Sequence, residues 1–192
     1  MFSESETIEQ KKSLRRELRA KIAVIPEKEF TEKSKIITTR LAAEIAKFPG
    51  KIIGTYQAVS GEPDISTLFA LKLRFCLPAL IEKNSPLVFR EYHPGDSLEP
   101  SHLYNHIMQP GVENPEIIPD IIIIPLLGFD TTGTRLGRGA GYYDRTLEFL
   151  RKKKKILCLG VGFEIQKILE IPTLPHDRKM DLIVTENRIY RF

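Results

Sequence analysis

The sequence lacks tryptophan altogether and contains only two cysteines, Cys76 and Cys158. Both cysteines lie inside apolar runs, which predicts buried, reduced thiols rather than a disulfide framework. The N-terminus, MFSESETIEQKK, has no apolar segment after a basic start, and no run approaches the roughly 18 apolar residues of a membrane span. We therefore expect a cytoplasmic protein without a membrane partner.

A large excess of charge of either sign is also missing, since the formal net charge is +4. This charge favours anionic ligands, but it is too small by itself to indicate nucleic-acid binding. The chain also lacks the aromatic residues interleaved with basic ones that single-stranded nucleic-acid binders use. A hydrophobic content of 42% over 192 residues is instead typical of a soluble domain with a sizeable core.

Helical and extended patterns alternate along much of the chain. Leu14, Leu18 and Ile22 are spaced four residues apart, which predicts a basic amphipathic helix at about 6–24. Further helices are expected at 32–48, 65–73, 142–152 and 163–170, strands at 51–57, 74–80, 86–92, 120–127, 155–162, 181–185 and 188–192, and a proline-rich loop at 93–119. The alternation predicts a single α/β domain over 1–192, with a mainly parallel sheet covered by helices on both faces in Rossmann-like layers.

The most unusual stretch joins four consecutive isoleucines, 121–124, to a region rich in glycine and arginine. In open α/β sheets, ligands bind beyond the carboxyl ends of the strands. Three glycines within 137–141 let the backbone approach a ligand, and Arg135 and Arg138 carry charge in a geometry suited to phosphate. A helix is expected to begin directly afterwards, and its first N–H groups favour anions. The stretch predicts a phosphate-binding loop, with a glycine-rich tight turn as the alternative.

Two familiar nucleotide motifs do not fit this loop. Thr134 and Arg135 stand where a P-loop requires Lys followed by Ser or Thr, and GRGAGYY differs from the Gly-x-Gly-x-x-Gly fingerprint. A nucleotide would therefore be held in another way.

Four charged residues are candidates for holding a nucleotide and its metal ion. Magnesium prefers one or two carboxylates together with phosphate oxygens and water, and Asp144 and Asp177 are the candidate carboxylates. Lys11 and Arg15 lie four residues apart, hence on one helical face, from which they would reach phosphates. Helix capping or plain solvent exposure is the alternative for all four, and spacing alone leaves the choice open.

Several stretches, taken together, resemble the 5-formyltetrahydrofolate cyclo-ligase (5,10-methenyltetrahydrofolate synthetase) family. They are KKSLR at 11–15, YQAVSGEPD at 56–64, ENPEIIPDIIIIP at 113–125, the signature at 125–145 that contains GTRLGRGAGYYDR, and the stretch at 160–185 that contains GFEIQ and LPHD. The matches occur in order along nearly the whole chain, and the central signature is highly specific. Ala140 departs from the glycine often found at its position, and the segment before Pro115 is longer and richer in proline than the family pattern.

The resemblance implies an ATP- and Mg²⁺-dependent ligase that converts 5-formyltetrahydrofolate to 5,10-methenyltetrahydrofolate and releases ADP and phosphate. The formyl oxygen would accept the γ-phosphoryl group, and nitrogen 10 would then attack the activated carbon. Such a reaction needs positioning and charge neutralisation more than a nucleophilic side chain. This need agrees with the sequence, in which no serine, cysteine or histidine arrangement indicates covalent catalysis.

The resemblance also implies a role for individual residues in nucleotide binding. Lys11 and Arg15 would contact the phosphates from the first helix, which would close over the nucleotide, and Arg138 would act beside the transferred group. The complete set implied in ATP binding is Lys11, Arg15, Arg135, Leu136, Gly137, Arg138, Gly139, Ala140, Gly141, Tyr142 and Tyr143.

The remaining implied roles concern the folate and the metal ion. Glu62 would hydrogen-bond the pterin ring, and Tyr143 would line the region of the substrate and the transferred phosphoryl group. Asp144 and Asp177 would hold Mg²⁺. The partners implied are small molecules only, without nucleic acid or membrane.

Two other functions fit parts of the sequence. A non-catalytic nucleotide- or folate-binding protein of the same fold would keep the glycines, but it would not need Asp144 and Asp177. A nucleic-acid-binding domain would depend on the basic first helix and on RKKKK at 151–155, and its binding would weaken steeply with salt.

Overall fold

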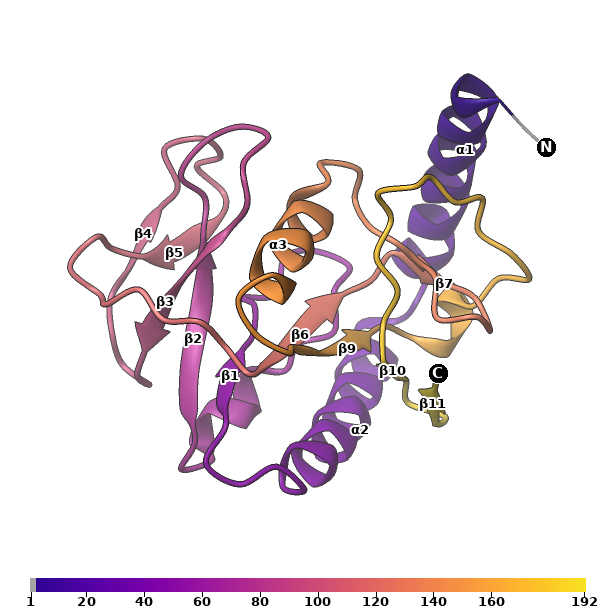
Figure 1. Cartoon of the computed structure of the whole chain (residues 1–192). Coiled ribbons are helices and arrows are strands. Elements are labelled where there is room, and N and C mark those ends of the chain that lie inside the picture. The colour runs from indigo at the N-terminus through magenta and orange to yellow at the C-terminus, as the bar shows by residue number, and fades with distance from the viewer. Residues whose placement is uncertain (1–2) are drawn as a thin grey trace.

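Seven strands form the central sheet in the computed structural model, which describes residues 3–192 (Figure 1). The strands are β1 Ile52–Gly54, β2 Arg74–Ala79, β3 Val88–Tyr92, β6 Ile121–Pro125, β9 Leu157–Val161, β10 Leu182–Val184 and β11 Ile189–Arg191. Their order is β11-β10-β9-β6-β1-β2-β3, and only the two edge strands, β3 and β11, run antiparallel to their neighbours. The mainly parallel sheet predicted from the sequence is confirmed.

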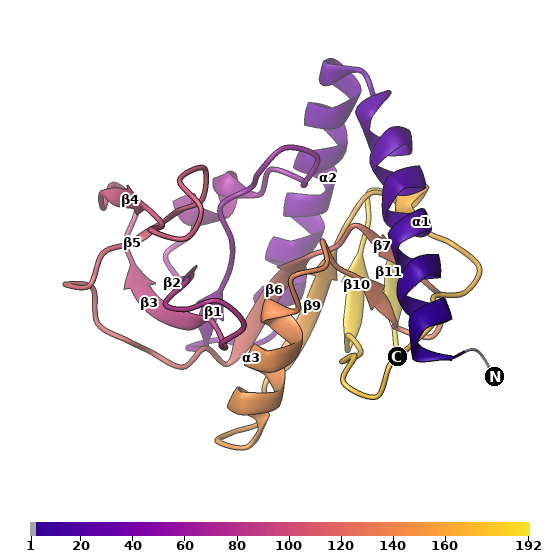
Figure 2. The ribbon, with the colours of Figure 1, turned by 90° about the horizontal axis from the view of Figure 1, so that it is seen from above.

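Helices cover both faces of this sheet. They are α1 Glu4–Ala23, α2 Glu27–Ile45 and α3 Tyr142–Arg151. Seen from above, α2 and α3 lie on opposite faces of the sheet, with α1 beside β7 (Figure 2). The isoleucines of β6 alternate accordingly: Ile121 and Ile123 pack in the core cluster of α2, whereas Ile122 and Ile124 pack in the cluster of α3. A run of four isoleucines therefore fits a strand that is buried on both faces.

The first helix begins with a capping box and docks through a small cluster of its own. The Ser3 hydroxyl accepts a hydrogen bond from the Glu6 N–H at 3.2 Å, while the Glu6 carboxylate accepts one from the Ser3 N–H at 2.7 Å. Further along, Leu18 and Ile22 are buried in a cluster separate from the two sheet cores. A Cβ atom on Gly128 would lie 2.6 Å from Leu18 Cδ1, so α1 approaches the chain where only glycine fits.

Two regions contain strands that the sequence did not predict. The stretch 93–119, expected to be a loop, contains a hairpin of β4 Leu98–Pro100 and β5 Met108–Pro110. A second, short hairpin of β7 Gly128–Phe129 and β8 Arg135–Leu136 precedes the glycine-rich stretch. Both hairpins are built from very short strands, whose alternation is too brief to show a period.

Three predicted helices differ from the observed ones. The second helix, α2, begins at Glu27, directly after Pro26, rather than at 32, and it ends at Ile45 rather than at 48. The stretches 65–73 and 163–170 form only short 3₁₀ helices, η1 Ser66–Ala70 and η2 Glu164–Gln166. After η2 the Ile168 N–H donates to the Phe129 carbonyl at 2.9 Å, so pairing with β7 replaces the helical hydrogen bonds.

Both cysteines are free and buried, as predicted. Burial raises the pKa of the Cys76 thiol well above its usual range and that of Cys158 to about 11, so both thiols stay protonated and unreactive at neutral pH.

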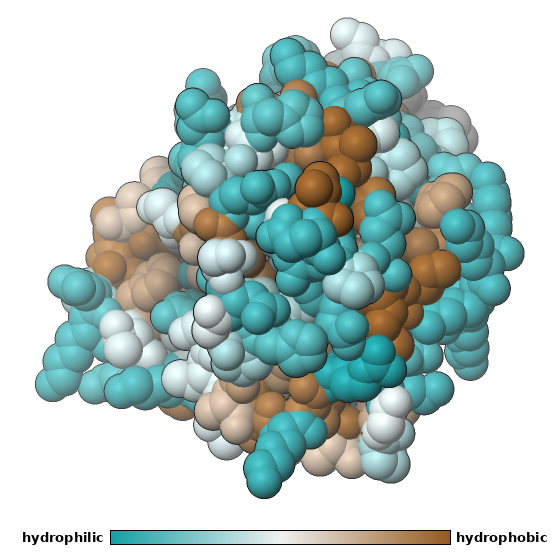
Figure 3. Space-filling view, turned by 90° about the vertical axis from the view of Figure 1, so that its left-hand side faces the viewer, coloured by the Kyte–Doolittle hydropathy of each residue, from teal (hydrophilic) through white to brown (hydrophobic). Residues whose placement is uncertain are grey.

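On the face that carries β3, β4 and β5, apolar residues reach the surface in separate patches among hydrophilic ones (Figure 3). Such scattered exposure is ordinary for globular proteins and marks no single binding surface. Within residues 3–192, no helix combines the length and hydropathy that crossing a lipid bilayer requires.

Candidate active site

A cleft of about 1730 Å³ opens at the carboxyl ends of β1 and β6, which are neighbours in the sheet. This is the edge at which open α/β sheets bind their ligands. The cleft is lined by α1, by the loops 56–64 and 174–177, by the stretch 135–144 and by the β4–β5 hairpin. Pockets for one small molecule typically span about 300–1,000 Å³, so the cleft has room for two small molecules side by side.

Every residue that the sequence assigned to ATP, folate or metal lines this cleft. They are Lys11, Arg15, Glu62, Arg135, Leu136, Gly137, Arg138, Gly139, Ala140, Gly141, Tyr142, Tyr143, Asp144 and Asp177. The fold therefore gathers residues from both ends of the chain at one place, although this proximity does not by itself test their individual roles.

The glycine loop, residues 137–141, leads into α3 with its backbone amides free. Gly139 and Gly141 have φ angles of 112° and 70°, in the left-handed region that glycine adopts without strain. Within the described chain, the N–H groups of residues 138–144 donate no hydrogen bond, and no side chain caps the start of α3. Free amides at a helix N-terminus bind anions, so the loop suits a phosphate group.

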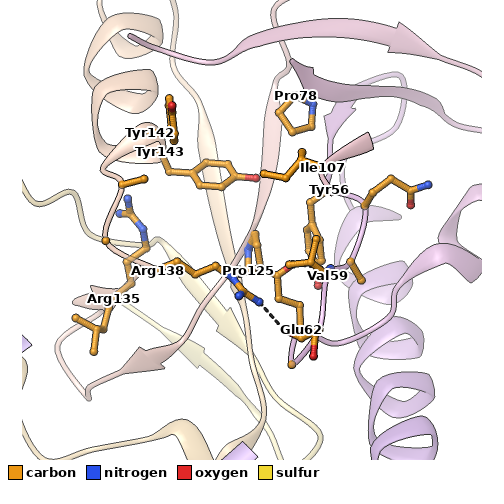
Figure 4. A pocket seen from close by; sticks show the side chains of 18 of the residues that line it. Tyr56, Val59, Glu62, Pro78, Ile107, Pro125, Arg135, Arg138, Tyr142 and Tyr143 are labelled. Carbon is orange, nitrogen blue, oxygen red and sulfur yellow. Dashed lines mark hydrogen bonds and ion pairs between the residues drawn. The ribbon is translucent and has the colours of Figure 1, made fainter. Parts of the chain in front are cut away.

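An ion pair joins the glycine loop to the opposite wall of the cleft (Figure 4). Arg138 Nε donates to Glu62 Oε1 at 2.8 Å, and its Nη2 donates to the Ser60 carbonyl at 2.7 Å. Glu62 also accepts a hydrogen bond from the Val59 N–H at 3.1 Å. Burial raises the pKa of the Glu62 carboxyl, and the Arg138 charge and the Val59 hydrogen bond only partly oppose this effect.

Two more ion pairs lie on the α1 side of the cleft. Lys11 is buried and pairs with Asp177, which lies 166 positions further along the chain. Arg135 Nη2 donates to Asp144 Oδ1 at 2.7 Å, and the same oxygen accepts from the Arg178 N–H at 3.0 Å. In both pairs, a cation expected to bind phosphate neutralises a carboxylate expected to bind metal.

The donor chemistry of Asp144 and Asp177 fits a hard cation such as Mg²⁺. Each carboxylate uses one oxygen in the hydrogen bonds recorded for residues 3–192, which leaves Asp144 Oδ2 and Asp177 Oδ1 for a further ligand. The described chain contains no group of three or more His, Cys, Asp or Glu side chains placed to hold a metal ion. These carboxylates therefore fit an ion that arrives with phosphate oxygens better than one bound by protein atoms alone.

The far end of the cleft is less polar and contains residues that the sequence analysis did not identify. Tyr104, His106 and Met108 of the β4–β5 hairpin line it. Tyr143 extends across the cleft towards Ile107 (Figure 4). Burial raises the pKa of the Tyr143 hydroxyl well above its usual range, so this group stays protonated. No motif marked Tyr104 or Met108, because they lie in the proline-rich stretch that was expected to be a loop.

The chain matches the model of the 5-formyltetrahydrofolate cyclo-ligase family over residues 7–186. It is 31% identical over 153 residues to the 5-formyltetrahydrofolate cyclo-ligase of Mycolicibacterium smegmatis, covering 74% of this chain and 77% of the relative. It is 30% identical over 136 residues to that of Escherichia coli K12, covering 68% of this chain and 73% of the relative.

Two solved structures share the fold over nearly the whole chain. The 5,10-methenyltetrahydrofolate synthetase of Aquifex aeolicus superposes with a TM-score of 0.75 at 27% identity, covering 94% of this chain and 92% of that one. The synthetase of Mycoplasma pneumoniae gives a TM-score of 0.69 at 26% identity, covering 92% of this chain and 98% of that one.

Proposed function

Because this chain belongs to the 5-formyltetrahydrofolate cyclo-ligase family, we propose that it converts 5-formyltetrahydrofolate to 5,10-methenyltetrahydrofolate with ATP and Mg²⁺. The observation that carries the proposal is the Arg138–Glu62 ion pair, which spans a cleft with room for two ligands. One side of this pair is an anion-binding loop and the other is a buried carboxylate, so a phosphate donor and a pterin would meet at Arg138.

The phosphate side is formed by the glycine loop and three cations. Free amides of residues 138–144 would hold phosphate oxygens, and Lys11, Arg15 and Arg135 would neutralise their charge. Asp144 and Asp177 would hold Mg²⁺, which, when bound, supplies further neutralisation of the phosphate charge.

The folate side is formed by Glu62 and the hairpin end of the cleft. The pterin ring carries an amino group and a ring N–H, both of which donate hydrogen bonds, and a carboxylate is an acceptor for both. Once Arg138 binds phosphate, Glu62 would lose its cationic partner. A buried carboxylate without a partner is unfavourable, so Glu62 would then accept hydrogen bonds from the pterin donors. Tyr143 would close the space between the two ligands.

The reaction we propose needs no covalent enzyme intermediate. The formyl oxygen attacks the γ-phosphorus, the bond to the bridging oxygen breaks, and ADP leaves. Nitrogen 10 then attacks the formyl carbon, gives up its proton, and phosphate departs as the ring closes. Arg138 would stabilise the charge of the phosphoryl group during transfer, and the two walls of the cleft would hold the reacting atoms in line.

Binding of nucleic acid gains little support from the basic run 151–155. Arg151 lies 3.7 Å from an Asp181 carboxylate oxygen, and Lys154 Nζ lies 3.1 Å from Asp120 Oδ1. Part of the run is therefore neutralised by the protein itself, and small molecules are the partners we propose. The cytoplasmic location and the single domain expected from the sequence stay predictions.

The test is to mix the protein with 5-formyltetrahydrofolate, ATP and Mg²⁺ and to follow the near-ultraviolet absorbance of the methenyl product. We expect a rise that depends on ATP and stops when ATP is omitted. Folded protein that gives no ATP-dependent rise would refute the proposal. Binding of both ligands without any product would instead support the non-catalytic alternative.

A further inference from the structure

Two arginine side chains hold the glycine loop from opposite sides. Arg15, on α1, donates from Nε to the Gly137 carbonyl at 2.9 Å. Arg145, in the first turn of α3, donates from Nη2 to the Ala140 carbonyl at 2.6 Å. The loop is therefore fastened through its carbonyl groups, while the amides of residues 138–144 stay free.

The glycines of the loop make room for these arginines. A Cβ atom on Gly139 would lie 3.3 Å from Arg15 Cζ, and one on Gly141 would lie 2.7 Å from Arg145 Nη1. A Cβ atom on Gly137 would meet nothing within 4 Å. Gly139 and Gly141 thus serve contacts inside the protein, and Gly137 is the glycine of this loop with open space beside it.

Arg145 reaches the loop from outside the cleft. It is half-buried and is not among the residues that line the cleft. Its guanidinium lies 5.2 Å from the centre of the Tyr142 ring and 3.5 Å from the Ser85 carbonyl oxygen. Its own N–H donates to the Gly141 carbonyl at 3.2 Å. The side chain is therefore held in place by several contacts and binds the loop at the Ala140 carbonyl, while the Arg145 backbone N–H binds the next carbonyl, that of Gly141.

A phosphate-binding loop must present N–H groups and withhold its carbonyl oxygens, because carbonyl oxygens repel anions. We propose that Arg145 is a positioning residue of this loop: by binding the Ala140 carbonyl, it keeps the loop in the conformation whose amides hold the nucleotide phosphates. The proposal rests on the proposed ATP site, and it assigns Arg145 no contact with the nucleotide or the folate.

The proposal is tested with Arg145→Ala, Arg145→Lys and the control Lys152→Ala, which removes an exposed cation at the C-cap of the same helix. ADP binding is measured by calorimetry, and folding is checked by thermal unfolding. The absorbance assay gives kcat and the KM values for ATP and for folate. For Arg145→Ala we expect the Kd for ADP and the KM for ATP to rise about tenfold, the scale of one charge-assisted hydrogen bond. We expect kcat and the KM for folate to change little.

Arg145→Lys is expected to recover part of the nucleotide affinity, because an ammonium keeps the charge but lacks the planar fork. Lys152→Ala should match the wild type in all measurements. Unchanged ADP affinity in folded Arg145→Ala overturns the proposal. A parallel loss of kcat, of affinity for both substrates and of thermal stability also overturns it, because it shows a general structural role.

The calorimetric measurement also separates this inference from the proposed function. If the wild-type chain binds ADP but makes no methenyl product, the proposed function fails, whereas weaker ADP binding by Arg145→Ala still supports the positioning role. If the wild type makes product and Arg145→Ala binds ADP as tightly as the wild type, the function stands and the inference fails.

Discussion

At the scale of single residues, Glu62 is a carboxylate in a place that disfavours its charge. The residue is 8% exposed, and burial raises the pKa of its carboxyl, although Arg138 partly opposes the effect. A raised pKa means that the folded chain binds this proton more tightly than the unfolded chain does. The protonated Glu62 carboxyl therefore contributes fully to stability below the unfolded-state pKa near 4.5. This contribution is lost as the pH rises through the folded-state pKa.

We predict that Glu62→Gln is more stable than the wild type at pH 8, because the buried charge is gone and the half-exposed Arg138 stays solvated. The difference should shrink as the pH falls towards 4.5, where the wild-type carboxyl also becomes neutral. Urea unfolding across this pH range measures the stability difference. The control is Glu82→Gln, which removes an exposed carboxylate. A stability difference that does not vary with pH would contradict the prediction. The gain in stability should accompany lost turnover, as is common for residues kept for function.

Asp144 is the second residue with a direct test. We predict that Asp144→Asn lowers turnover by roughly two orders of magnitude, the scale of losing one electrostatic contact in a transition state. The variant should also need more Mg²⁺ for half-maximal nucleotide binding, because a charged ligand is lost. Asp96→Asn is the matched control, since Asp96 lines the same cleft without an assigned ligand. If Asp144→Asn has the turnover and the Mg²⁺ requirement of the wild type, Asp144 is not a metal ligand.

Among the residues, the sequence named candidates that the fold brings to one cleft, but it did not predict the contacts they make with one another. Lys11, Arg138 and Glu62 were each assigned to a ligand from a motif, and all three line the cleft. That Arg138 binds Glu62 in the ligand-free chain follows from the packing of two loops 76 positions apart. Spacing along the chain carries no information on such a distance, because it depends on the tertiary fold.

At the scale of elements, α1 carries two of the cations that we assign to phosphate, Lys11 and Arg15, and it docks through a small apolar cluster. Leu18 is fully buried in the small cluster that α1 shares with Leu127 and Leu136. Lys11 lies about two turns before this anchor, and Arg15 lies about one turn before it. The phosphate contacts that we propose for α1 therefore depend on how firmly this helix is docked.

We predict that Leu18→Ala destabilises the protein by about 2–5 kcal/mol and also weakens nucleotide binding, because the cavity loosens α1. Urea unfolding and ADP calorimetry measure the two effects. Val24→Ala, at a position that is 76% exposed near the end of the same helix, is the control. If nucleotide affinity is unchanged despite the lost stability, α1 is not the element that holds the phosphates.

The elements that the sequence predicted well have strong local patterns. The isoleucine run of β6 and the apolar stripe of α1 each bury the residues that their patterns indicate. The predicted helix at 163–170 was wrong because its apolar residues do not share a buried face. Phe163 is fully buried, whereas Leu169 is 93% exposed, and buried Gln166 instead donates to the Leu126 carbonyl at 2.6 Å. Tertiary pairing thus overrode a weak period.

At the scale of the whole molecule, the cleft neutralises its own charges before any ligand arrives. Asp144, Asp177 and Glu62 each pair with a cation that we assign to phosphate. A nucleotide therefore competes with three carboxylates for these cations. A divalent ion that binds the released carboxylates would lower the cost of this exchange.

We predict that ATP and Mg²⁺ together raise the melting temperature by more than the sum of their separate effects. Ligand present at 100 times its Kd stabilises a fold by about 2.7 kcal/mol, which a thermal shift resolves readily. Adding a chelator to the ATP sample should remove most of the increase. An equal shift with and without Mg²⁺ would show that the carboxylates do not oppose nucleotide binding.

At this scale, the fold class could be predicted from the sequence because helical and extended patterns alternate along much of the chain. This alternation predicted the mainly parallel sheet that the structure shows. The β4–β5 hairpin at the far end of the cleft escaped prediction, because proline-rich segments have no periodic pattern and its strands are short.

The Lys11–Asp177 pair has a consequence for how the protein is made. Lys11 leaves the ribosome long before its partner, which follows 166 positions later. During synthesis, the buried lysine of α1 therefore lacks this carboxylate partner until 166 further residues have been added. Nascent chains that end before Asp177 would carry the glycine loop but lack this closing contact, so competence to hold a nucleotide is expected only after Asp177 has been added.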